Sequence, residues 1–192
     1  MSDGVGAVKS LDEVLEDAWR TLKRGCADRR HVAHTPTLVT IDDSGAPTAR
    51  TVVLRAVDAP WLRFHTDVRA DKWRQLKANP AAAVHVYLPK LKVQLRLSGR
   101  AELHESDAIS RQAWDASQGM SRQIYRISPG PGSVIEEPLS WTQMTEDDAK
   151  ANFGVVRLDV QRLEWLYLQA AGHQRARFER QGDGWRGHWL VP

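Results

Sequence analysis

The first regular pattern along the chain is helical. Apolar residues recur three or four positions apart from Leu11 onward, a spacing that predicts an amphipathic helix over residues 11–24. Ser10 and Glu13 have the spacing of a capping box, in which each side chain accepts a hydrogen bond from the other residue's backbone N–H. We therefore expect the helix to begin directly after Ser10.

Beyond His31 the pattern changes to short β-prone runs, which are typical of strands. Turn-forming residues separate neighbouring runs and predict hairpins, as in the Asp-Asp-Ser-Gly segment at 42–45. A short helix is expected over residues 69–78, because Asn79-Pro80 stops it. The strands predicted in this part of the chain are residues 37–41, 48–57, 61–66, 82–88 and 93–102.

The second half of the chain repeats this alternation of helices and strands. A predicted helix over residues 106–117 precedes a Pro/Gly-rich loop at 128–132 and a short helix over residues 145–151. Short antiparallel strands with helices inserted between them indicate a single mainly β (α+β) domain over residues 1–192, either a barrel or a sheet. The last predicted strands are residues 154–160, 163–169, 174–180 and 185–191.

Composition narrows the class of protein. A chain of 192 residues with 42% hydrophobic residues suits one domain with a core of its own. The single cysteine, Cys26, cannot form an internal disulfide, and no Cys/His pattern has zinc spacing, so we expect a reducing, cytoplasmic environment and no metal. The N-terminal sequence and the short apolar runs predict neither a signal peptide nor a membrane span.

Charge is concentrated in the middle of the chain. The net charge is only +3, but residues 50–100 hold 11 bases against Asp58, Asp67 and Asp71. This surplus predicts an anionic partner, either a phosphate on a small molecule or a nucleic-acid backbone. The sequence motifs of dinucleotide folds, P-loops, serine hydrolases and zinc proteases are absent from the sequence.

Two segments of this basic region are candidates for phosphate binding. Arg50 and Arg55 bracket an apolar strand, and the alternative is that both simply reach solvent at the strand ends. Residues 64–72 run from a strand into a helix start with Thr66, Arg69 and Lys72 around the turn, where free N–H groups favour an anion. The alternative there is a solvated, charged helix face.

In sequence order, these segments resemble a known family. The R-x-V-x-L-R run at 50–55, the F-x-T-[DN] end at 64–67, Lys72, Asn79-Pro80 and the Q-x-R-x-x-G run at 94–99 look like the flavin-binding half of the pyridoxamine 5′-phosphate oxidase family. The C-terminal half is similar too, in Arg-Phe at 177–178, Gly-Asp-Gly-Trp at 182–185 and the terminal Leu-Val-Pro. The resemblance covers roughly residues 35–192. It is closest to the oxidase-related branch.

The resemblance implies a split β-barrel of antiparallel strands with flanking helices that binds FMN and acts as a homodimer, with the flavin between the subunits. Lys72 would pair with the phosphate, and Trp165 and Arg177 would come from the partner subunit. Carried over by position, the expected flavin-binding residues are Arg50, Thr51, Val52, Val53, Leu54, Arg55, His65, Thr66, Arg69, Lys72, Gln94, Trp165 and Arg177.

The sequence also departs from the family pattern. The usual Ser-Arg-Lys before the phosphate helix reads Ala70-Asp71-Lys72, which leaves Arg69 to replace the lost base. The R-x-H that the oxidase uses on its vitamin substrate reads His173-Gln174-Arg175, so His173 and Arg175 are weak substrate-binding candidates. The Tyr/Arg/Ser constellation expected around residues 114–122 is not reproduced.

The sequence therefore favours an FMN-dependent oxidoreductase with an unknown small-molecule substrate, with no catalytic residue assigned. It is not expected to be an efficient pyridoxamine 5′-phosphate oxidase. The first alternative is a non-catalytic flavin- or tetrapyrrole-binding module. A nucleic-acid binder ranks third, because alternating strand faces scatter the bases of residues 50–100.

Overall fold

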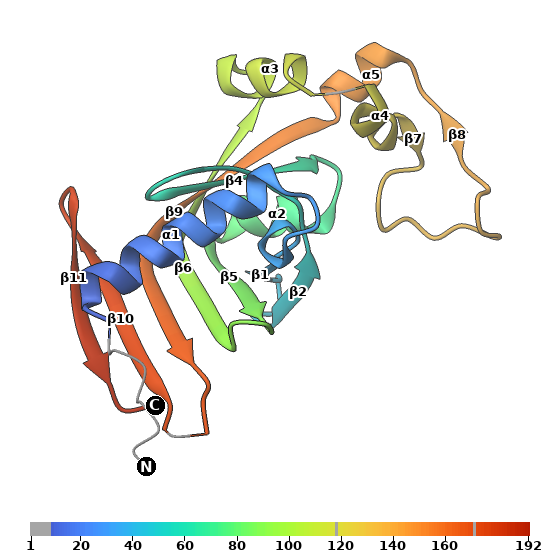
Figure 1. The fold of residues 1–192 in the computed structure, drawn as a ribbon. Helices are drawn as coiled ribbons and strands as arrows, with labels where there is room; N and C mark the ends of the chain where they lie inside the picture. Colours follow the sequence, from blue (N-terminus) through green and yellow to red (C-terminus); the bar gives the residue numbers. More distant parts are fainter. Residues whose placement is uncertain (1–8, 118, 171) are drawn as a thin grey trace.

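The computed structural model describes residues 9–117, 119–170 and 172–192. Its main sheet has nine strands, in the order β11-β10-β9-β6-β5-β1-β2, with β4 also paired to β9 and β3 paired to β4 (Figure 1). Every pair is antiparallel, so the predicted mainly β architecture with flanking helices is confirmed. The strands are β1 Thr37–Ile41, β2 Pro47–Thr51, β3 Leu54–Asp58, β4 Trp61–Asp67, β5 Ala81–Leu88, β6 Val93–Glu105, β7 Ile127–Ser128, β8 Thr142–Gln143, β9 Phe153–Tyr167, β10 Gln174–Gln181 and β11 Gly184–Leu190.

The helices lie in two places. Helix α1 crosses the sheet, whereas α3, α4 and α5 gather beyond one end of it (Figure 1). None of the helices in the described ranges is long and apolar enough to cross a membrane. The helices are α1 Leu11–Ala27, α2 Asp71–Ala78, α3 Ala108–Asp115, α4 Gly119–Arg122 and α5 Glu146–Ala151, with 3-10 turns η1 Val32–His34 and η2 Gln123–Arg126.

Helix α1 closes the main hydrophobic core. The predicted capping box is present, because Ser10 and Glu13 each accept the other's backbone N–H. Val14 and Leu22 are fully buried among the side chains that line the inner face of the sheet, such as Val84 and Leu97. Cys26, near the end of this helix, is half-buried, and burial raises the pKa of its thiol, as expected for an unreactive cysteine.

The predicted strand at 48–57 is wrong as a single element. Strand β2 pairs with β1, whereas β3 pairs with β4, so the chain changes partner at Val52 and Val53. The Val52 N–H donates to the carbonyl of Pro36 at 3.0 Å, which is the last bond in the β1–β2 register, and from Leu54 onward the chain pairs with β4. Because the strand breaks there, the alternation of sides expected from Arg50 to Arg55 does not carry across the gap.

The predicted strands at 154–160 and 163–169 are in fact one strand, the 15-residue β9. The prediction left Gln161 and Arg162, which are exposed, between two strands, but the register with β6 shows a bulge at this point, where Ser98 faces Arg162 and Gly99 faces Val160. Gln161 is therefore the extra residue in an unbroken strand. The strand runs from the helices at one end of the molecule to β10 at the other (Figure 1).

A second, smaller core lies under the helices beyond the barrel. Trp114, Tyr125 and Phe153 are buried there with their rings in edge-to-face contact. The sequence predicted α3 and α5 here, although both are shorter than expected, and it missed α4, η2 and the short β7–β8 pair. These elements lie on both sides of the Pro/Gly-rich loop, where local spacing gives no strong period.

Gly99 provides a test of the bulge. A Cβ at this position would lie 1.8 Å from the Asp159 carbonyl oxygen, so Gly99→Ala forces β6 and β9 apart. We expect the free energy of unfolding, measured with urea, to fall by about 3 kcal/mol, the upper end of overpacking costs. Gly184→Ala is the control, because its nearest neighbour would be 3.8 Å away. Equal stability of the two variants would contradict the assigned register.

Candidate functional site

A buried polar network lies where α2 packs on β1 and β2. The Arg50 guanidinium donates through Nη1 to the Thr40 hydroxyl at 2.5 Å and through Nη2 to the Thr48 hydroxyl at 2.8 Å. Both hydroxyls in turn donate to Oε1 of Gln75, at 2.6 and 3.0 Å, and Arg50 also reaches this oxygen directly at 3.0 Å. Arg50 is thus fixed by uncharged oxygen atoms rather than extended into solvent.

Lys72 is the second cation beside this network. Its Nζ donates to the Thr66 hydroxyl at 3.1 Å, and burial together with the nearby charge of Arg50 lowers the pKa of Lys72. Burial also lowers the pKa of Arg50. Among the described residues, neither cation forms an ion pair with a carboxylate. Two half-buried, uncompensated positive charges are costly, so this place favours an anion.

The start of α2 places backbone N–H groups beside these two cations. Ala70 occupies the N-cap position and provides no side-chain hydrogen bond to the first N–H groups of the helix. The family's usual serine would stand at this position. The first N–H groups of α2 therefore have no side-chain acceptor from the N-cap residue, although Asp71 places an acidic residue in the same turn.

Arg69, which the sequence leaves to replace the lost base, is paired with a carboxylate in the structure. Its backbone N–H and its Nε both donate to Oδ1 of Asp67, at 2.8 and 2.9 Å, and its Nη2 donates to Oδ2 at 2.6 Å. Asp67 is buried, and this bidentate pair neutralises both groups. The uncompensated positive charge at the start of α2 thus comes from Arg50 and Lys72.

His65 lies on the outer side of β4, toward the smaller core. Burial and the charges of Arg55 and Arg63 lower its pKa to about 3, so the ring is neutral at physiological pH. The rings of His65 and Phe153 lie edge-to-face at a centroid distance of 4.9 Å, and the buried Nε2 of His65 has no hydrogen-bond partner among the described residues. Nε of Arg55 is also buried, with no hydrogen-bond partner in the part of the chain that the structure describes. A bound ligand that accepts or donates a hydrogen bond here would satisfy these polar atoms.

The residues between Arg50 and Arg55 differ in exposure. Thr51 is exposed, and Val52 and Val53 are half-buried at the strand break. Leu54 is 1% exposed and belongs to the main core, so its side chain is directed into the barrel rather than toward a ligand.

A second cluster of predicted site residues lies on the outer face of the sheet. Glu164, buried on β9, accepts hydrogen bonds from Arg96 and, at 2.7 Å, from Arg175, and its other oxygen lies 3.5 Å from Nε of Arg177. Although burial alone raises it, the bonds from Arg175 and Arg96 hold the pKa of Glu164 below its ordinary value. Gln94 shares this face, because it lies two residues from Arg96 on β6. Three arginines around one carboxylate leave this cluster positive.

The structure does not bring Trp165 to this cluster. Side chains alternate along β9, so Trp165 faces away from Glu164 and packs on the inner face, opposite Leu95 and Ala176 in the register. It is 8% exposed and lies against the rings of Tyr167 and Trp189. His173 is also apart from the cluster: it is exposed, and its Nδ1 accepts the backbone N–H of Gln169.

The two groups of residues are far apart within one copy of the chain. Thr66 pairs with Gly154 and Arg177 pairs with Glu164, and these partners are ten positions apart on β9. At the rise of an extended strand, this separation is roughly 30 Å. One small ligand cannot contact both Thr66 and Arg177 of the same copy.

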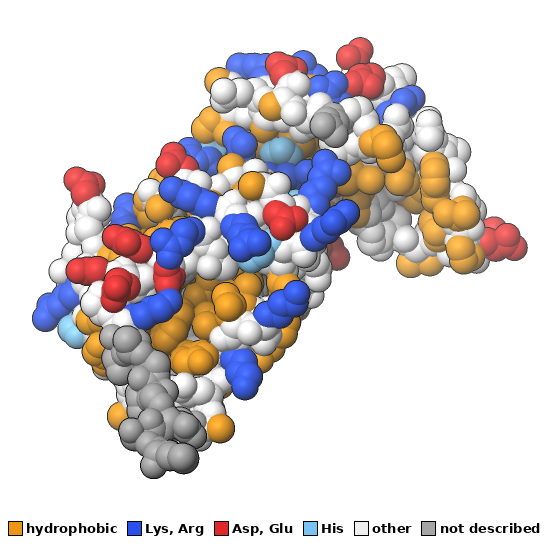
Figure 2. Space-filling view, in the orientation of Figure 1, with side chains coloured by type: hydrophobic (Ala, Val, Ile, Leu, Met, Phe, Trp, Pro, Cys, Tyr) orange, Lys and Arg blue, Asp and Glu red, His pale blue; other side chains and the backbone are white. Residues whose placement is uncertain are grey.

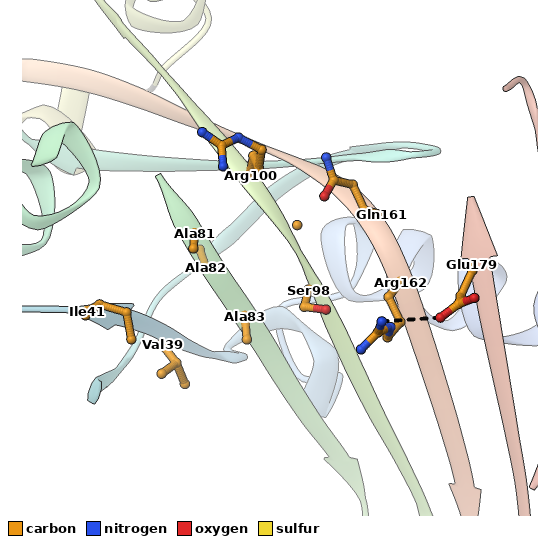
Figure 3. A pocket seen from close by; sticks show the side chains of 11 residues that line it. Val39, Ile41, Ala81, Ala82, Ala83, Ser98, Arg100, Gln161, Arg162 and Glu179 are labelled. Atoms are coloured by element: carbon orange, nitrogen blue, oxygen red, sulfur yellow. Dashed lines mark ion pairs between the residues drawn. The ribbon is translucent and has the colours of Figure 1, made fainter. Parts of the chain in front are cut away.

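The outer face also carries a shallow cleft of about 540 Å³. Small side chains from Ala81, Ala83 and Ser98 form its floor, and Arg162 pairs with Glu179 at 3.3 Å on one side (Figure 3).

Basic and acidic side chains are mixed on the surface, and the face in Figure 2 shows no continuous basic stripe. Arg74 and Arg96, from the basic middle of the chain, are both paired with carboxylates.

Comparisons with known proteins agree with these features. Residues 16–105 match the family model described as pyridoxamine 5′-phosphate oxidase, FMN-binding domain. The pyridoxine/pyridoxamine 5′-phosphate oxidase of Burkholderia thailandensis is 30% identical over 190 residues, covering 92% of this chain and 86% of that protein. The protein of the same name from Pseudomonas syringae pv. syringae is 28% identical over 204 positions, covering 99% and 94%.

Solved structures confirm the split-barrel fold. A pyridoxamine 5′-phosphate oxidase-related, FMN-binding protein from Nostoc punctiforme superposes with a TM-score of 0.74 at 23% identity, covering 97% of this chain and all of that one. PhzG from Burkholderia lata, in complex with tetrahydrophenazine-1-carboxylic acid, gives 0.72 at 19% identity, covering 97% and 95%. The matched domain binds FMN, which confirms the predicted cofactor. The uncompensated cations at the start of α2 fit its phosphate.

The neutral state of His65 predicts a pH effect on stability. The unfolded chain binds a proton at His65 below pH 6.5, whereas the folded chain does so only near pH 3. The neutral ring therefore makes its full contribution to the free energy of unfolding well above pH 6.5. This contribution is lost as the pH drops, by about 1.4 kcal/mol between pH 7.5 and 5.5. Urea unfolding should show this loss in the native protein and not in His65→Gln. The exposed His188→Gln variant should behave like the native protein, and an equal pH response of all three would refute the shift.

Proposed function

This chain belongs to the pyridoxamine 5′-phosphate oxidase family, and from that premise we propose that it is an FMN-dependent oxidoreductase acting on a small molecule as a homodimer. The observation that carries the proposal is the pair of half-buried cations, Arg50 and Lys72, neither of which forms an ion pair in the described structure; Asp67 and Asp71 act on them only through space. A phosphate supplies the missing negative charge.

In this proposal the phosphate lies between Lys72, the charge of Arg50 and the N-terminus of α2. The Thr66 hydroxyl, which accepts a bond from Lys72, orients that ammonium group. Nε2 of the neutral His65 and residues 51–53 and Arg55 supply contacts to the rest of the cofactor. FMN, when bound, carries the electrons of the reaction, so the protein needs to provide binding, orientation and electrostatics.

We propose that the second subunit completes the flavin site with Gln94 and Arg177. The roughly 30 Å between Thr66 and Arg177 within one copy supports this arrangement, because both can reach one flavin only from different copies. The shallow, small-residue face beside Glu164 suits close packing of a second copy (Figure 3). Trp165 is left out of the proposed site, since it lies on the inner face.

The substrate is proposed to be a small molecule other than the vitamer phosphates. Of the two weak candidates, Arg175 shares Glu164 with Arg177 and so lies beside a proposed flavin contact, whereas His173 is in an exposed loop.

We also propose that the protein is located in the cytoplasm, because the single cysteine suits a reducing compartment.

Lys72→Ala tests the phosphate site. Removing this ammonium group deletes one charge-assisted hydrogen bond, so we expect FMN binding to weaken by roughly 1.5–3 kcal/mol. The dissociation constant is measured by quenching of flavin fluorescence on titration with apoprotein. Lys77→Ala, on the same helix but exposed, should bind FMN like the native protein. An unchanged constant in folded Lys72→Ala would remove Lys72 from the phosphate site.

The reaction type is tested with the FMN-loaded protein. We expect amine or alcohol donors, or a reduced nicotinamide, to bleach the flavin absorbance without oxygen.

With pyridoxamine or pyridoxine 5′-phosphate, we expect kcat/KM below about 10⁴ M⁻¹s⁻¹, the lower end of ordinary enzymes, because the substrate residues of the family are not reproduced. A higher value would show that these departures do not matter. A flavin that no donor reduces would indicate a non-catalytic flavin-binding protein.

A further inference from the structure

We propose that Gln75 is a positioning residue for the cofactor phosphate: its uncharged amide oxygen fixes the Arg50 guanidinium and leaves the charge of that guanidinium uncompensated. Gln75 lies on α2, three residues after Lys72, with its side chain directed into the barrel at 5% exposure. The inference rests on the phosphate site proposed above.

The hydrogen bonds of Arg50 converge on an acceptor at this position. Arg50 can only donate, so the Thr40 and Thr48 hydroxyls that accept from it can donate their own protons onward; they also lie 3.1 Å from each other, and the Thr48 hydroxyl lies 3.4 Å from the Thr40 carbonyl. Both hydroxyls donate to Oε1 of Gln75, and Arg50 Nη2 donates to the same oxygen. Oε1 of Gln75 therefore accepts hydrogen bonds from three donors: the two hydroxyls and the guanidinium.

The uncharged state of that acceptor matters as much as its position. The remaining Arg50 bonds go to the carbonyl oxygens of Leu38 and Thr48, at 3.5 and 3.1 Å, which are also neutral. Asp71 acts on Arg50 only through space, and its own carboxylate is exposed and bonded to Arg74. A carboxylate in place of the Gln75 amide would accept the same bonds but cancel the Arg50 charge and repel a phosphate.

A purely structural role for Gln75 leads to different expectations. If Gln75 only holds α2 on the barrel, its replacement by glutamate should change binding of any flavin to the same degree. If it leaves Arg50 charged for the phosphate, the loss should depend on whether the flavin carries a phosphate. Riboflavin, which has the same ring and ribityl chain without the phosphate, separates the two roles.

The experiment is therefore Gln75→Glu, titrated as apoprotein against FMN and against riboflavin. We expect FMN affinity to fall roughly tenfold or more, the scale of one charge-assisted hydrogen bond, while riboflavin affinity stays within about twofold. The urea midpoint of the apoprotein should not fall, because every hydrogen bond is kept and an ion pair is gained. The control Gln181→Glu makes the same charge change at the end of β10, where the residue is exposed, and should alter neither affinity.

Unchanged FMN affinity in Gln75→Glu, or equal losses for FMN and riboflavin, would overturn the inference. Gln75→Met is the second variant, which removes the acceptor without adding charge. It should lower FMN affinity less than Gln75→Glu does and leave riboflavin binding unchanged; a larger FMN loss in Gln75→Met would also overturn the inference. If Lys72→Ala leaves FMN binding unchanged, the phosphate site itself is wrong; if Lys72→Ala weakens binding and Gln75→Glu does not, only the role of Gln75 is wrong.

Discussion

The continuous pairing of β9 is the constraint on which the rest of the structure depends. This one strand pairs with β4 near its start, with β6 along most of its length and with β10 near its end. It therefore joins the barrel, the helical region and the C-terminal hairpin into one framework. The bulge at Gln161 lets the strand bend without breaking, and Gly99 is required there because no side chain fits against the Asp159 carbonyl.

The same strand divides the proposed site. Thr66 and Lys72 lie near one end of β9, and Arg177 lies beside its other end. A rigid paired strand cannot shorten this distance, so in the proposed site the contacts of Gln94 and Arg177 come from a second copy of the chain. The length of β9 thus links the fold to the proposed dimer: the residues that complete one flavin site are those that the framework holds farthest from that site's own phosphate end.

Much of this was predictable from local patterns. The capping box fixed the start of α1, and turn residues correctly separated most of the strands. The errors arise where tertiary pairing overrides local sequence. Gln161 and Arg162 lie between two predicted strands but belong to a bulge, and the apolar run at 52–54 looks like one strand but changes partner. Trp165 was assigned to the flavin on position alone, whereas its side is set by alternation within the longer β9.

The residues that the sequence did not reveal are the partners of the basic side chains. Arg50, Arg69 and Arg177 looked alike as candidates, yet the structure gives them different surroundings: neutral oxygens, a buried Asp67 and a shared Glu164. Gln75 offered a weak signal, as an amide between Trp73 and Leu76 on the buried side of a helix.

These surroundings decide which arginine remains available to an anion. A paired arginine has its charge cancelled, whereas Arg50 keeps its charge at the cost of partial desolvation and of repulsion with Lys72. A bound phosphate relieves both costs, so cofactor binding and stability of this end of the barrel are coupled. The basic middle of the chain predicts an anionic partner. That prediction depends less on the total charge of this segment than on Arg50 and Lys72, two cations that form no ion pair within the described residues.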